Sequence, residues 1–271
     1  MTRIKQALTI AGSDSGGGAG IQADIKAIQA NGVFAASVVT AVTAQNTVEV
    51  RSAVELPLES IRAQLEAVFD DLDITAAKTG MLASTGVIET VASFLKGIGF
   101  GNLVVDPVMI SKSGYSLLAA DAVTALRDQL LPLALVATPN LHEAALLSGI
   151  EITGLDTMRE AARIIHGSGP RNVIVKGGHA DFSPGTDVLF DGGEFHEFTA
   201  DAVFDRSVHG TGCTFSAAIT ARLALGEPLT EAVANAKAYV TRAIEYQLEI
   251  GAGHGPGHHF YFLDSSDFRK N

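Results

Sequence analysis

Cysteine and positive charge are both scarce in this sequence. The chain has one cysteine, Cys213, so it cannot form an internal disulfide. Its 19 lysine and arginine residues face 30 aspartate and glutamate residues, which gives a formal net charge of −11. Bulk charge therefore does not favour duplex nucleic acid or an anionic membrane as a partner, and we expect neither.

Long apolar runs are absent too. No stretch reaches the roughly 18 apolar residues that a membrane-spanning helix requires, and the apolar segment near the N-terminus is too short for a signal peptide. We therefore expect a cytoplasmic location. Hydrophobic residues make up 47% of the chain and charged residues 18%, a balance typical of a folded chain with a large core. The length of 271 residues predicts a single domain over 1–271.

Short β-rich runs alternate with longer segments of helical periodicity along the chain. Strands are predicted at 7–11, 37–42, 74–78, 103–105, 135–138 and 173–176, and helices at 21–30, 58–69, 86–95, 120–130, 141–147, 158–166, 214–224 and 230–250. This order predicts an α/β fold with a mostly parallel central sheet flanked by helices. The segment TDVLFDGGEFHEF predicts an antiparallel hairpin at the sheet edge, turning around Asp191-Gly192-Gly193.

Most of the loops rich in glycine and polar residues follow a predicted strand. They read GSDSGGGAG, AQN, KTGM, DPVM, TPNLHE, KGGH and HGTGCT in chain order. Open α/β sheets bind their ligands beyond the carboxyl ends of the strands, where such loops lead into helices. We therefore expect these loops to form one common site.

The segment HGTGCT precedes a long helical run and is suited to an anion. Backbone N–H groups of Gly210, Thr211, Gly212 and Cys213 can converge there near a helix N-terminus. They would stabilise the negative charge that develops during phosphoryl transfer. A glycine-rich turn ahead of a core helix is the alternative. Cys213 is then either a base, with a pKa that the helix dipole lowers, or a small buried apolar side chain.

A second group of residues is suited to a flat heterocycle. The glycine-rich segment that begins at Gly12 lacks the spacing of a P-loop, but its backbone allows a small ligand to lie close. Gln45 can both donate and accept hydrogen bonds, which a heterocycle with a ring nitrogen beside an exocyclic amine requires. The alternative is that Gln45 lies in a surface turn. Val42, Met81 and Val108 can pack on the ring, although each fits a core position equally well.

Charged and polar residues at the same strand ends indicate a metal and phosphate site. Asp106, Asn140 and Glu143 would hold Mg²⁺ largely through water, while Asn140 and Glu143 also have the spacing of a helix-capping pair. Lys176 ends a strand and can reach a nucleotide phosphate, unless it is a solvated strand-end lysine. Asp24, one turn into the first helix, either faces the ligand or only complements the helix dipole.

The tail GAGHGPGHH brings His254, His258 and His259 close together in sequence. Glycine and proline give these histidines no rigid spacing, and no carboxylate or thiolate lies between them. We expect a C-terminal loop rather than a metal site.

These motifs, taken together, resemble a known family. AGSDSGGGAGIQADIK, TAVTAQN, AKTGML, DPVM, TPNLHEA, VKGGH, HGTGCTFSAAI and GHGP occur in the order found in the ribokinase-like small-molecule kinases, and within them in the hydroxymethylpyrimidine/phosphomethylpyrimidine kinases of thiamine biosynthesis. The resemblance covers nearly the whole chain. The long N-terminal motif and HGTGCTFSAAI are the specific parts, whereas NxxE or KGG alone would be weak.

The resemblance implies a three-layer ribokinase-like fold and a defined reaction. That reaction is ATP-dependent phosphorylation of 4-amino-5-hydroxymethyl-2-methylpyrimidine, followed by phosphorylation of the monophosphate at the same site. The alternatives are a pyridoxal kinase of the same superfamily and a non-catalytic sensor of the pyrimidine or nucleotide. The resemblance also implies a homodimer.

Each candidate residue takes a role from the resemblance. Residues 210–213 form the anion hole, with Cys213 where many relatives have an aspartate base. Asp24 and Gln45 hydrogen-bond the aminopyrimidine, and Met81 and Val108 pack on its ring. The residues expected at Mg²⁺ and at the ATP phosphates are Asp106, Asn140, Glu143 and Lys176.

Overall fold

The computed structural model describes residues 4–109, 119, 121–178, 182–200 and 208–263. Within these residues a single sheet has the strand order β3-β2-β1-β4-β5-β6-β7-β8-β9. The strands are β1 Gln6–Asp14, β2 Phe34–Gln45, β3 Val50–Glu55, β4 Ile74–Thr79, β5 Leu103–Val105, β6 Val136–Ala137, β7 Val173–Lys176, β8 Thr186–Phe190 and β9 Phe195–Thr199.

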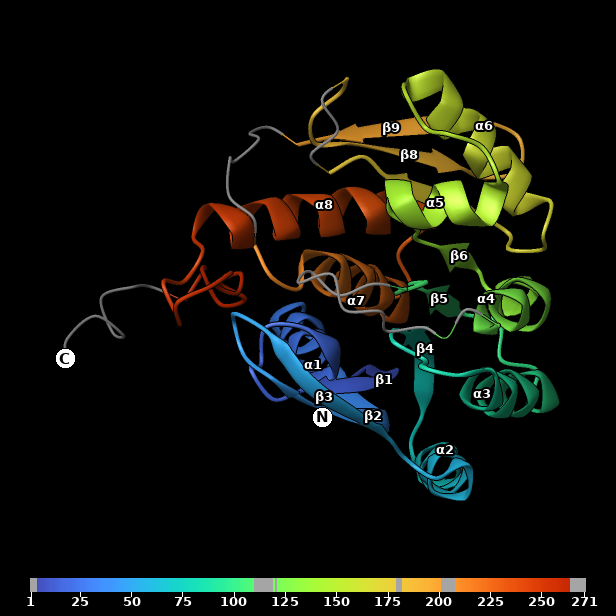
Figure 1. The fold of residues 1–271 in the computed structure, drawn as a ribbon, viewed down its shortest axis with the longest axis vertical. Helices are drawn as coiled ribbons and strands as arrows, with labels where there is room; N and C mark the ends of the chain where they lie inside the picture. Colours follow the sequence, from blue (N-terminus) through green and yellow to red (C-terminus); the bar gives the residue numbers. More distant parts are fainter. Residues whose placement is uncertain (1–3, 110–118, 120, 179–181, 201–207, 264–271) are drawn as a thin grey trace.

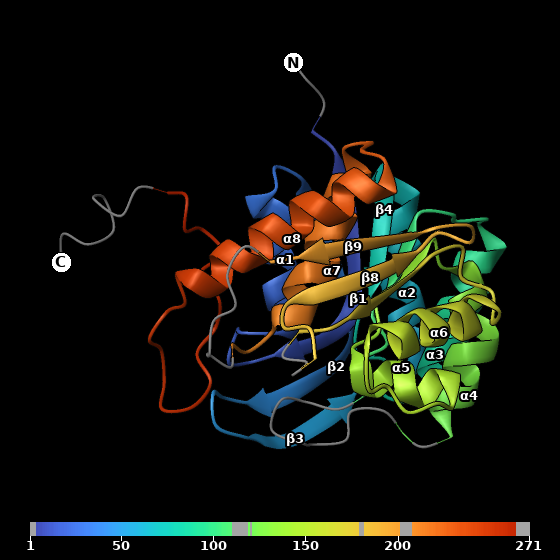
Figure 2. The ribbon, with the colours of Figure 1, turned by 90° about the horizontal axis from the view of Figure 1, so that it is seen from above.

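The helices form two outer layers. They are α1 Gly20–Ala30, α2 Leu58–Asp71, α3 Thr85–Gly97, α4 Ala122–Ala125, η1 Leu126–Leu130, η2 Leu131–Leu133, α5 Leu141–Ser148, α6 Leu155–His166, α7 Thr211–Ala224 and α8 Leu229–Glu245. Helices α1, α7 and α8 cover one face of the sheet, and α2, α3, α5 and α6 cover the other (Figures 1 and 2). No helix in the described part of the chain is both long and apolar enough to cross a bilayer.

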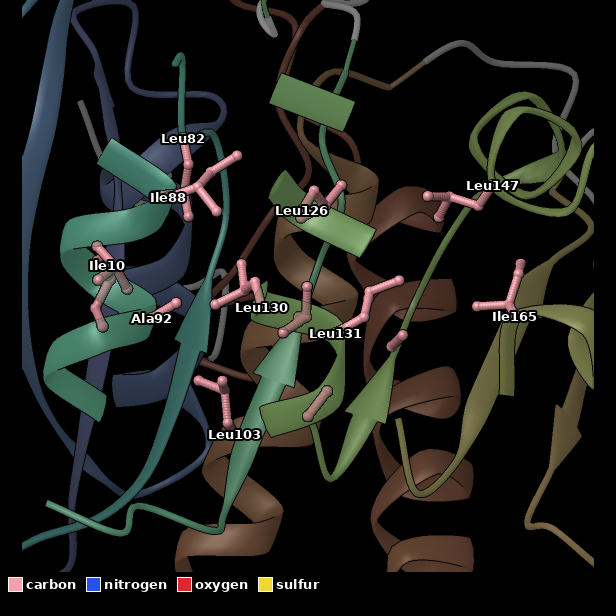
Figure 3. Packing of buried hydrophobic residues seen from close by; sticks show 14 of the residues in the cluster. Ile10, Leu82, Ile88, Ala92, Leu103, Leu126, Leu130, Leu131, Leu147 and Ile165 are labelled. Carbon is pink, nitrogen blue, oxygen red and sulfur yellow. The ribbon is translucent and has the colours of Figure 1, made fainter. Parts of the chain in front are cut away.

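Strands buried on both faces supply two separate apolar cores. Successive side chains of a strand point to opposite faces, so Leu103 and Val105 enter one core while Val104 enters the other. Figure 3 shows the first core, where Ile10 and Leu103 of the sheet lie among apolar side chains of the covering helices, such as Ile88, Ala92 and Leu130. The strands from β2 to β7 in the sheet order pair in parallel, and helices bury both faces, which confirms the predicted mostly parallel sheet between helix layers.

The strand order explains why the site forms beyond β1. Strand β1 pairs in parallel with β2 on one side and with β4 on the other. The chain connections therefore diverge at β1, and such a switch point opens a crevice at the carboxyl ends of the strands. The GSDSGGGAG loop follows β1 directly into this crevice.

One edge of the sheet agrees with the prediction and the other does not. The hairpin of β8 and β9 is antiparallel, as predicted around residues 191–193. Strand β3 was not predicted, yet it pairs antiparallel with β2 at the opposite edge. All its side chains beyond Val50 are exposed, so it carries no alternation of buried and polar residues that a sequence pattern could reveal. The turn before it is formed by the Asn46 side chain, which accepts hydrogen bonds from the Val48 and Glu49 amides.

Most predicted helices agree with the structure within three residues at each end, and two differ more. The segment 120–130 begins outside the described residues and continues as α4, one wide π-helical turn (η1) and a 3₁₀ turn (η2) that contains Pro132. The segment 230–250 is helical only to Glu245. Beyond it the Leu248 amide donates to the Pro256 carbonyl, so the chain turns back on itself instead of extending α8.

Candidate active site

A cavity of about 570 Å³ lies at the carboxyl ends of the central strands. All the sequence-predicted site residues line it except Asp24 and Val42. The lining members are Gly12, Gln45, Met81, Asp106, Val108, Asn140, Glu143, Lys176, Gly210, Thr211, Gly212 and Cys213. The loop before α7 and the strand end that carries Gln45 therefore share one cavity, which is the spatial relationship that the sequence interpretation required.

The start of helix α7 depends on a glycine at its N-cap. Gly210 has a φ of 77°, in the left-handed region that favours glycine, and a Cβ there would lie 1.9 Å from the Gly18 carbonyl oxygen. The first amides of a helix have no acceptor within the helix. In α7 these amides belong to residues that line the cavity, since residues 210–213 all do so. The glycine-rich loop after β1 and the start of α7 thus pack backbone against backbone around an anion-binding helix N-terminus.

Lys176 and Asp106 form an ion pair beside this helix start. Lys176 Nζ lies 2.9 Å from Asp106 Oδ1, and a Cβ on Gly212 would lie 3.3 Å from the same Nζ. Burial acts to raise the pKa of the Asp106 carboxyl, but Lys176 and Lys78 outweigh it and hold that pKa below its ordinary value. Asp106 is therefore ionised, and the Lys176 ammonium lies next to the proposed anion hole.

Asn140 and Glu143 form the capping box that their spacing predicts. The Asn140 side chain accepts a hydrogen bond from the Glu143 amide at 2.9 Å, and Glu143 Oε2 accepts one from the Asn140 amide at 2.8 Å. Both residues also line the cavity, so capping and a ligand role are compatible. Burial raises the pKa of Glu143 to about 7, with Lys176 opposing the shift. A divalent cation would favour its ionised form.

A buried charged network supports the floor of the cavity. Lys78 is fully buried on β4, and its Nζ lies 2.9 Å from both Asp24 Oδ1 and Ser216 Oγ. Ser216 Oγ in turn donates to Asp106 Oδ2 at 3.1 Å. Burial acts to lower the pKa of Lys78, but the Asp24 and Asp106 carboxylates reverse this and hold it above its ordinary value. The network links α1, β4, β5 and α7.

Sequence interpretation missed Lys78 and Ser216. The available signal was the lysine in AAKTG, a cation in an otherwise buried strand, which is rarely stable without a partner. Ser216 lies within an apolar helical run, and nothing local marks it as a partner of Lys78.

Asp24 and Val42 are placed differently from the prediction. Asp24 is fully buried between Lys78 and Thr9, whose hydroxyl donates to Asp24 Oδ2 at 2.6 Å, so the Asp24 carboxylate does not reach the cavity.

Val42 lies on β2 between Ala41 and Thr43. Side chains alternate along a strand, so with Thr43 and Gln45 lining the cavity, Val42 points to the other face, where 47% of it is exposed.

The predicted effect of the helix dipole on Cys213 is wrong. Burial raises the pKa of the Cys213 thiol to about 12, Asp24 and Asp106 add to the shift, and Lys78 opposes it. Desolvation, together with the field of these two carboxylates, outweighs the dipole of α7. Cys213 is therefore a protonated thiol at neutral pH.

Asp14 and His209 also line the cavity, although neither was among the predicted site residues. Asp14 ends β1, and its carboxylate accepts hydrogen bonds from the amides of Gly16, Gly18 and Ala19 at 2.8 to 3.1 Å. His209 Nε2 lies 3.1 Å from Asp14 Oδ2. This pair fixes the glycine-rich loop to the residue that precedes the anion hole.

A second ion pair lies at another part of the cavity wall. Lys237 Nζ of α8 lies 2.7 Å from Asp187 Oδ2 of β8, and both residues line the cavity. No local motif marks this pair, because its members are 50 residues apart.

The sheet order, the helix layers and the anion-binding start of α7 define a kinase of the ribokinase-like class. Solved structures agree: a Bacillus subtilis pyridoxal kinase in complex with ADP superposes with a TM-score of 0.90 at 40% identity, covering 97% of this chain and all of that one. A phosphomethylpyrimidine kinase from Clostridium difficile gives a TM-score of 0.80 at 45% identity, over 89% of this chain and all of that one.

The chain belongs to the phosphomethylpyrimidine kinase family, whose model matches residues 14–258. It is 50% identical over 97% of its length to the hydroxymethylpyrimidine/phosphomethylpyrimidine kinase of Haemophilus influenzae, of which it covers 99%. The fold and family resemblance predicted from the motifs are thereby confirmed, and the protein is a phosphotransferase that uses ATP.

Proposed function

We propose that the protein phosphorylates 4-amino-5-hydroxymethyl-2-methylpyrimidine and then its monophosphate, with ATP as donor, for thiamine biosynthesis. The observation that carries this proposal is the shared cavity: Gln45, Met81 and Val108 line it together with the start of α7 and Lys176. Gln45 suits an aminopyrimidine edge, and the apolar pair suits its ring. The α7 amides and the Lys176 ammonium suit the γ-phosphoryl group.

The chemistry needs only positioning and charge stabilisation from these residues. In the first step the hydroxymethyl oxygen bonds to the γ-phosphorus while the bond to the bridging oxygen of ADP breaks, and the hydroxyl proton passes to an oxygen of the transferred phosphoryl group and from there to water. In the second step the acceptor is a phosphate oxygen that carries no proton to remove. The α7 amides would stabilise the equatorial oxygens in both steps.

The cavity residues fit the Mg²⁺ ion that such a kinase would use. Asp106 and Glu143 offer hard oxygen ligands at one wall. Within the described ranges, no cluster of three or more His, Cys, Asp or Glu side chains could hold a metal, so the ion would keep most of its water shell. When bound, Mg²⁺ would neutralise phosphate charge and orient the triphosphate.

Turnover of ATP with each acceptor tests the function. Product formation with the free pyrimidine, its monophosphate and pyridoxal is measured by chromatography, with and without Mg²⁺. We expect both pyrimidines to be phosphorylated, and to react with higher kcat/KM than pyridoxal. A preference for pyridoxal would favour the alternative kinase, and tight pyrimidine binding without phosphate transfer would favour a sensor.

Because a thiol with a pKa of about 12 holds its proton at neutral pH and cannot accept the hydroxyl proton, we expect Cys213→Ala to change kcat for the first phosphorylation and the pyrimidine Kd by less than about threefold. The second phosphorylation is expected to change equally little, because a phosphate acceptor has no hydroxyl proton to lose. Single-turnover rates and titration calorimetry measure the two effects. A loss of tenfold or more in kcat that is confined to the first phosphorylation would contradict this and restore the base role that the family resemblance implies.

Replacing Lys176 with methionine is expected to lower kcat/KM for ATP by about 100-fold, because the cavity loses the cation beside the α7 amides. Lys96→Met is the matched control, since Lys96 is exposed near the end of α3. Steady-state kinetics with varied ATP check the effect. Less than a threefold difference between the two variants would show that Lys176 does not contact phosphate.

The homodimer implied by the family resemblance stays a prediction. Sedimentation velocity at micromolar concentration distinguishes one copy from two.

A further inference from the structure

The hydrogen bonds around Gln45 are inconsistent with one orientation of its amide and consistent with the other. His209 Nε2 lies 3.1 Å from Asp14 Oδ2 and 3.0 Å from Gln45 Nε2. Asp14 accepts three backbone N–H groups, and although burial acts to raise its pKa, His209 and the Ala19 and Gly16 amides hold that pKa below its ordinary value. An ionised carboxylate can only accept, so the hydrogen must be on His209 Nε2.

That assignment leaves two donors facing each other. A protonated His209 Nε2 and the N–H group of Gln45 Nε2 cannot hydrogen-bond across 3.0 Å. At the oxygen end of the Gln45 amide there are too few hydrogens rather than too many. The Thr43 hydroxyl has one hydrogen and two acceptors within reach: the Ser13 carbonyl at 2.9 Å and Gln45 Oε1 at 3.3 Å.

Exchanging the two ends of the Gln45 amide resolves both conflicts. The ends have nearly the same shape, and hydrogen-bond partners decide which end is oxygen. With the oxygen toward His209, the imidazole N–H is shared between Asp14 and Gln45. With the nitrogen toward Thr43, the amide donates to the hydroxyl oxygen, and that hydroxyl donates to Ser13.

His209 is itself held in place from several sides. Its backbone amide donates to the Gly255 carbonyl at 3.0 Å, which fixes it to the C-terminal loop. A Cβ on Gly18 would lie 2.6 Å from His209 Cδ2, so the glycine-rich loop packs closely on the ring. The imidazole is 13% exposed and lines the cavity. Its N–H therefore presents a fixed direction to Gln45.

We propose that His209 is a positioning residue that sets the orientation of the Gln45 amide and so determines which donor and acceptor the cavity offers to the heterocycle. An amide has two N–H donors and two oxygen lone pairs. Thr43 takes one donor and His209 one lone pair, which leaves one of each for the ligand. This pair complements a ring nitrogen beside an exocyclic amine. The ligand assignment rests on the proposed function, whereas the amide orientation does not.

Two substitutions separate the N–H of His209 from its bulk. His209→Ala removes the donor and frees the amide to rotate, whereas His209→Gln keeps an N–H at the position of Nε2. For the alanine variant we expect the KM for the aminopyrimidine to rise about 10- to 100-fold, with kcat and the KM for ATP within about threefold of wild type. We expect the glutamine variant to recover most of the loss. We also expect the alanine variant to discriminate less between the aminopyrimidine and its 4-oxo analogue.

Nitrogen-15 NMR of the ligand-free wild-type protein provides a readout that does not depend on turnover. The His209 resonances, assigned by their loss in His209→Gln, should show a proton on Nε2. An unprotonated Nε2 would overturn the proposal, as would an unchanged pyrimidine KM in His209→Ala. Equal losses in pyrimidine KM, ATP KM and kcat would also overturn it, because they indicate a disturbed loop. If the wild type fails to phosphorylate either pyrimidine, the proposed function fails, and the Nε2 proton still decides the amide orientation.

Discussion

Replacing Lys78 with methionine is expected to reduce the free energy of unfolding by about 3 to 5 kcal/mol, because it leaves Asp24 buried without its counter-charge. Both side chains are fully buried, and Lys78 Nζ lies 2.9 Å from Asp24 Oδ1 and 4.0 Å from Asp106 Oδ2. Methionine fills much of the same volume, so the loss reports the missing charge rather than a cavity. Urea denaturation followed by circular dichroism measures it.

The double variant Lys78→Met/Asp24→Asn gives the decisive comparison. Neutralising Asp24 removes the uncompensated charge, so the double variant should recover more than half of the stability that Lys78→Met loses. Lys96→Met again serves as the exposed control and should change stability by less than about 0.5 kcal/mol. A loss below about 1 kcal/mol in Lys78→Met would contradict the buried ion pair.

Replacing Gly210 with alanine is expected to lower kcat by about 100- to 1,000-fold, the size of effect seen when an oxyanion donor is lost. The new Cβ would lie 1.9 Å from the Gly18 carbonyl oxygen, and both partners are backbone, so the loop before α7 must move. The same change forces alanine into a φ of 77°. Displacement of the first α7 amides would misalign the donors for the phosphoryl group.

Gly226→Ala is the matched control for Gly210→Ala. Gly226 follows the other end of α7 with a φ of 89°, and a Cβ there meets nothing within 4 Å. It carries a similar backbone strain without the clash, so we expect a small loss of stability and unchanged kcat. Steady-state assays at saturating ATP and pyrimidine compare kcat of the two variants. Similar kcat values in both variants would show that the anion hole tolerates displacement.

The fold was largely predictable because its signals are local. Strands such as 103–105 and 173–176 are short apolar runs between helical segments, and both are fully or mainly buried in the structure. Strand β3 could not be predicted, because its exposed side chains carry no pattern and only its pairing with β2 makes it a strand. Helix α8 ends early for a similar reason, since the Leu248 amide pairs with the distant Pro256.

The site was predictable in its loops but not in its charges. Glycine and polar motifs at strand ends correctly placed Gln45 and Gly210 in one cavity, because parallel strands end at the same edge of a sheet. Asp24 has the same local setting as a ligand-facing carboxylate, yet Lys78, 54 residues away, holds it in the interior. Cys213 lies at a helix start that by itself lowers a thiol pKa, but burial of the thiol reverses the effect, and the Asp24 and Asp106 carboxylates add to it.

Three features can be predicted from the amino-acid sequence alone: the layers, the strand ends that meet at the crevice, and the positions where glycine lets backbone approach backbone. Those features follow from side-chain periodicity and allowed backbone angles, which act over a few residues. In contrast, which charged side chains are paired, which are buried and which face the ligand depends on tertiary contacts. Lys78 and Ser216 are 138 residues apart and His209 and Asp14 are 195 apart, and the energies of such contacts exist only once the chain has brought them together.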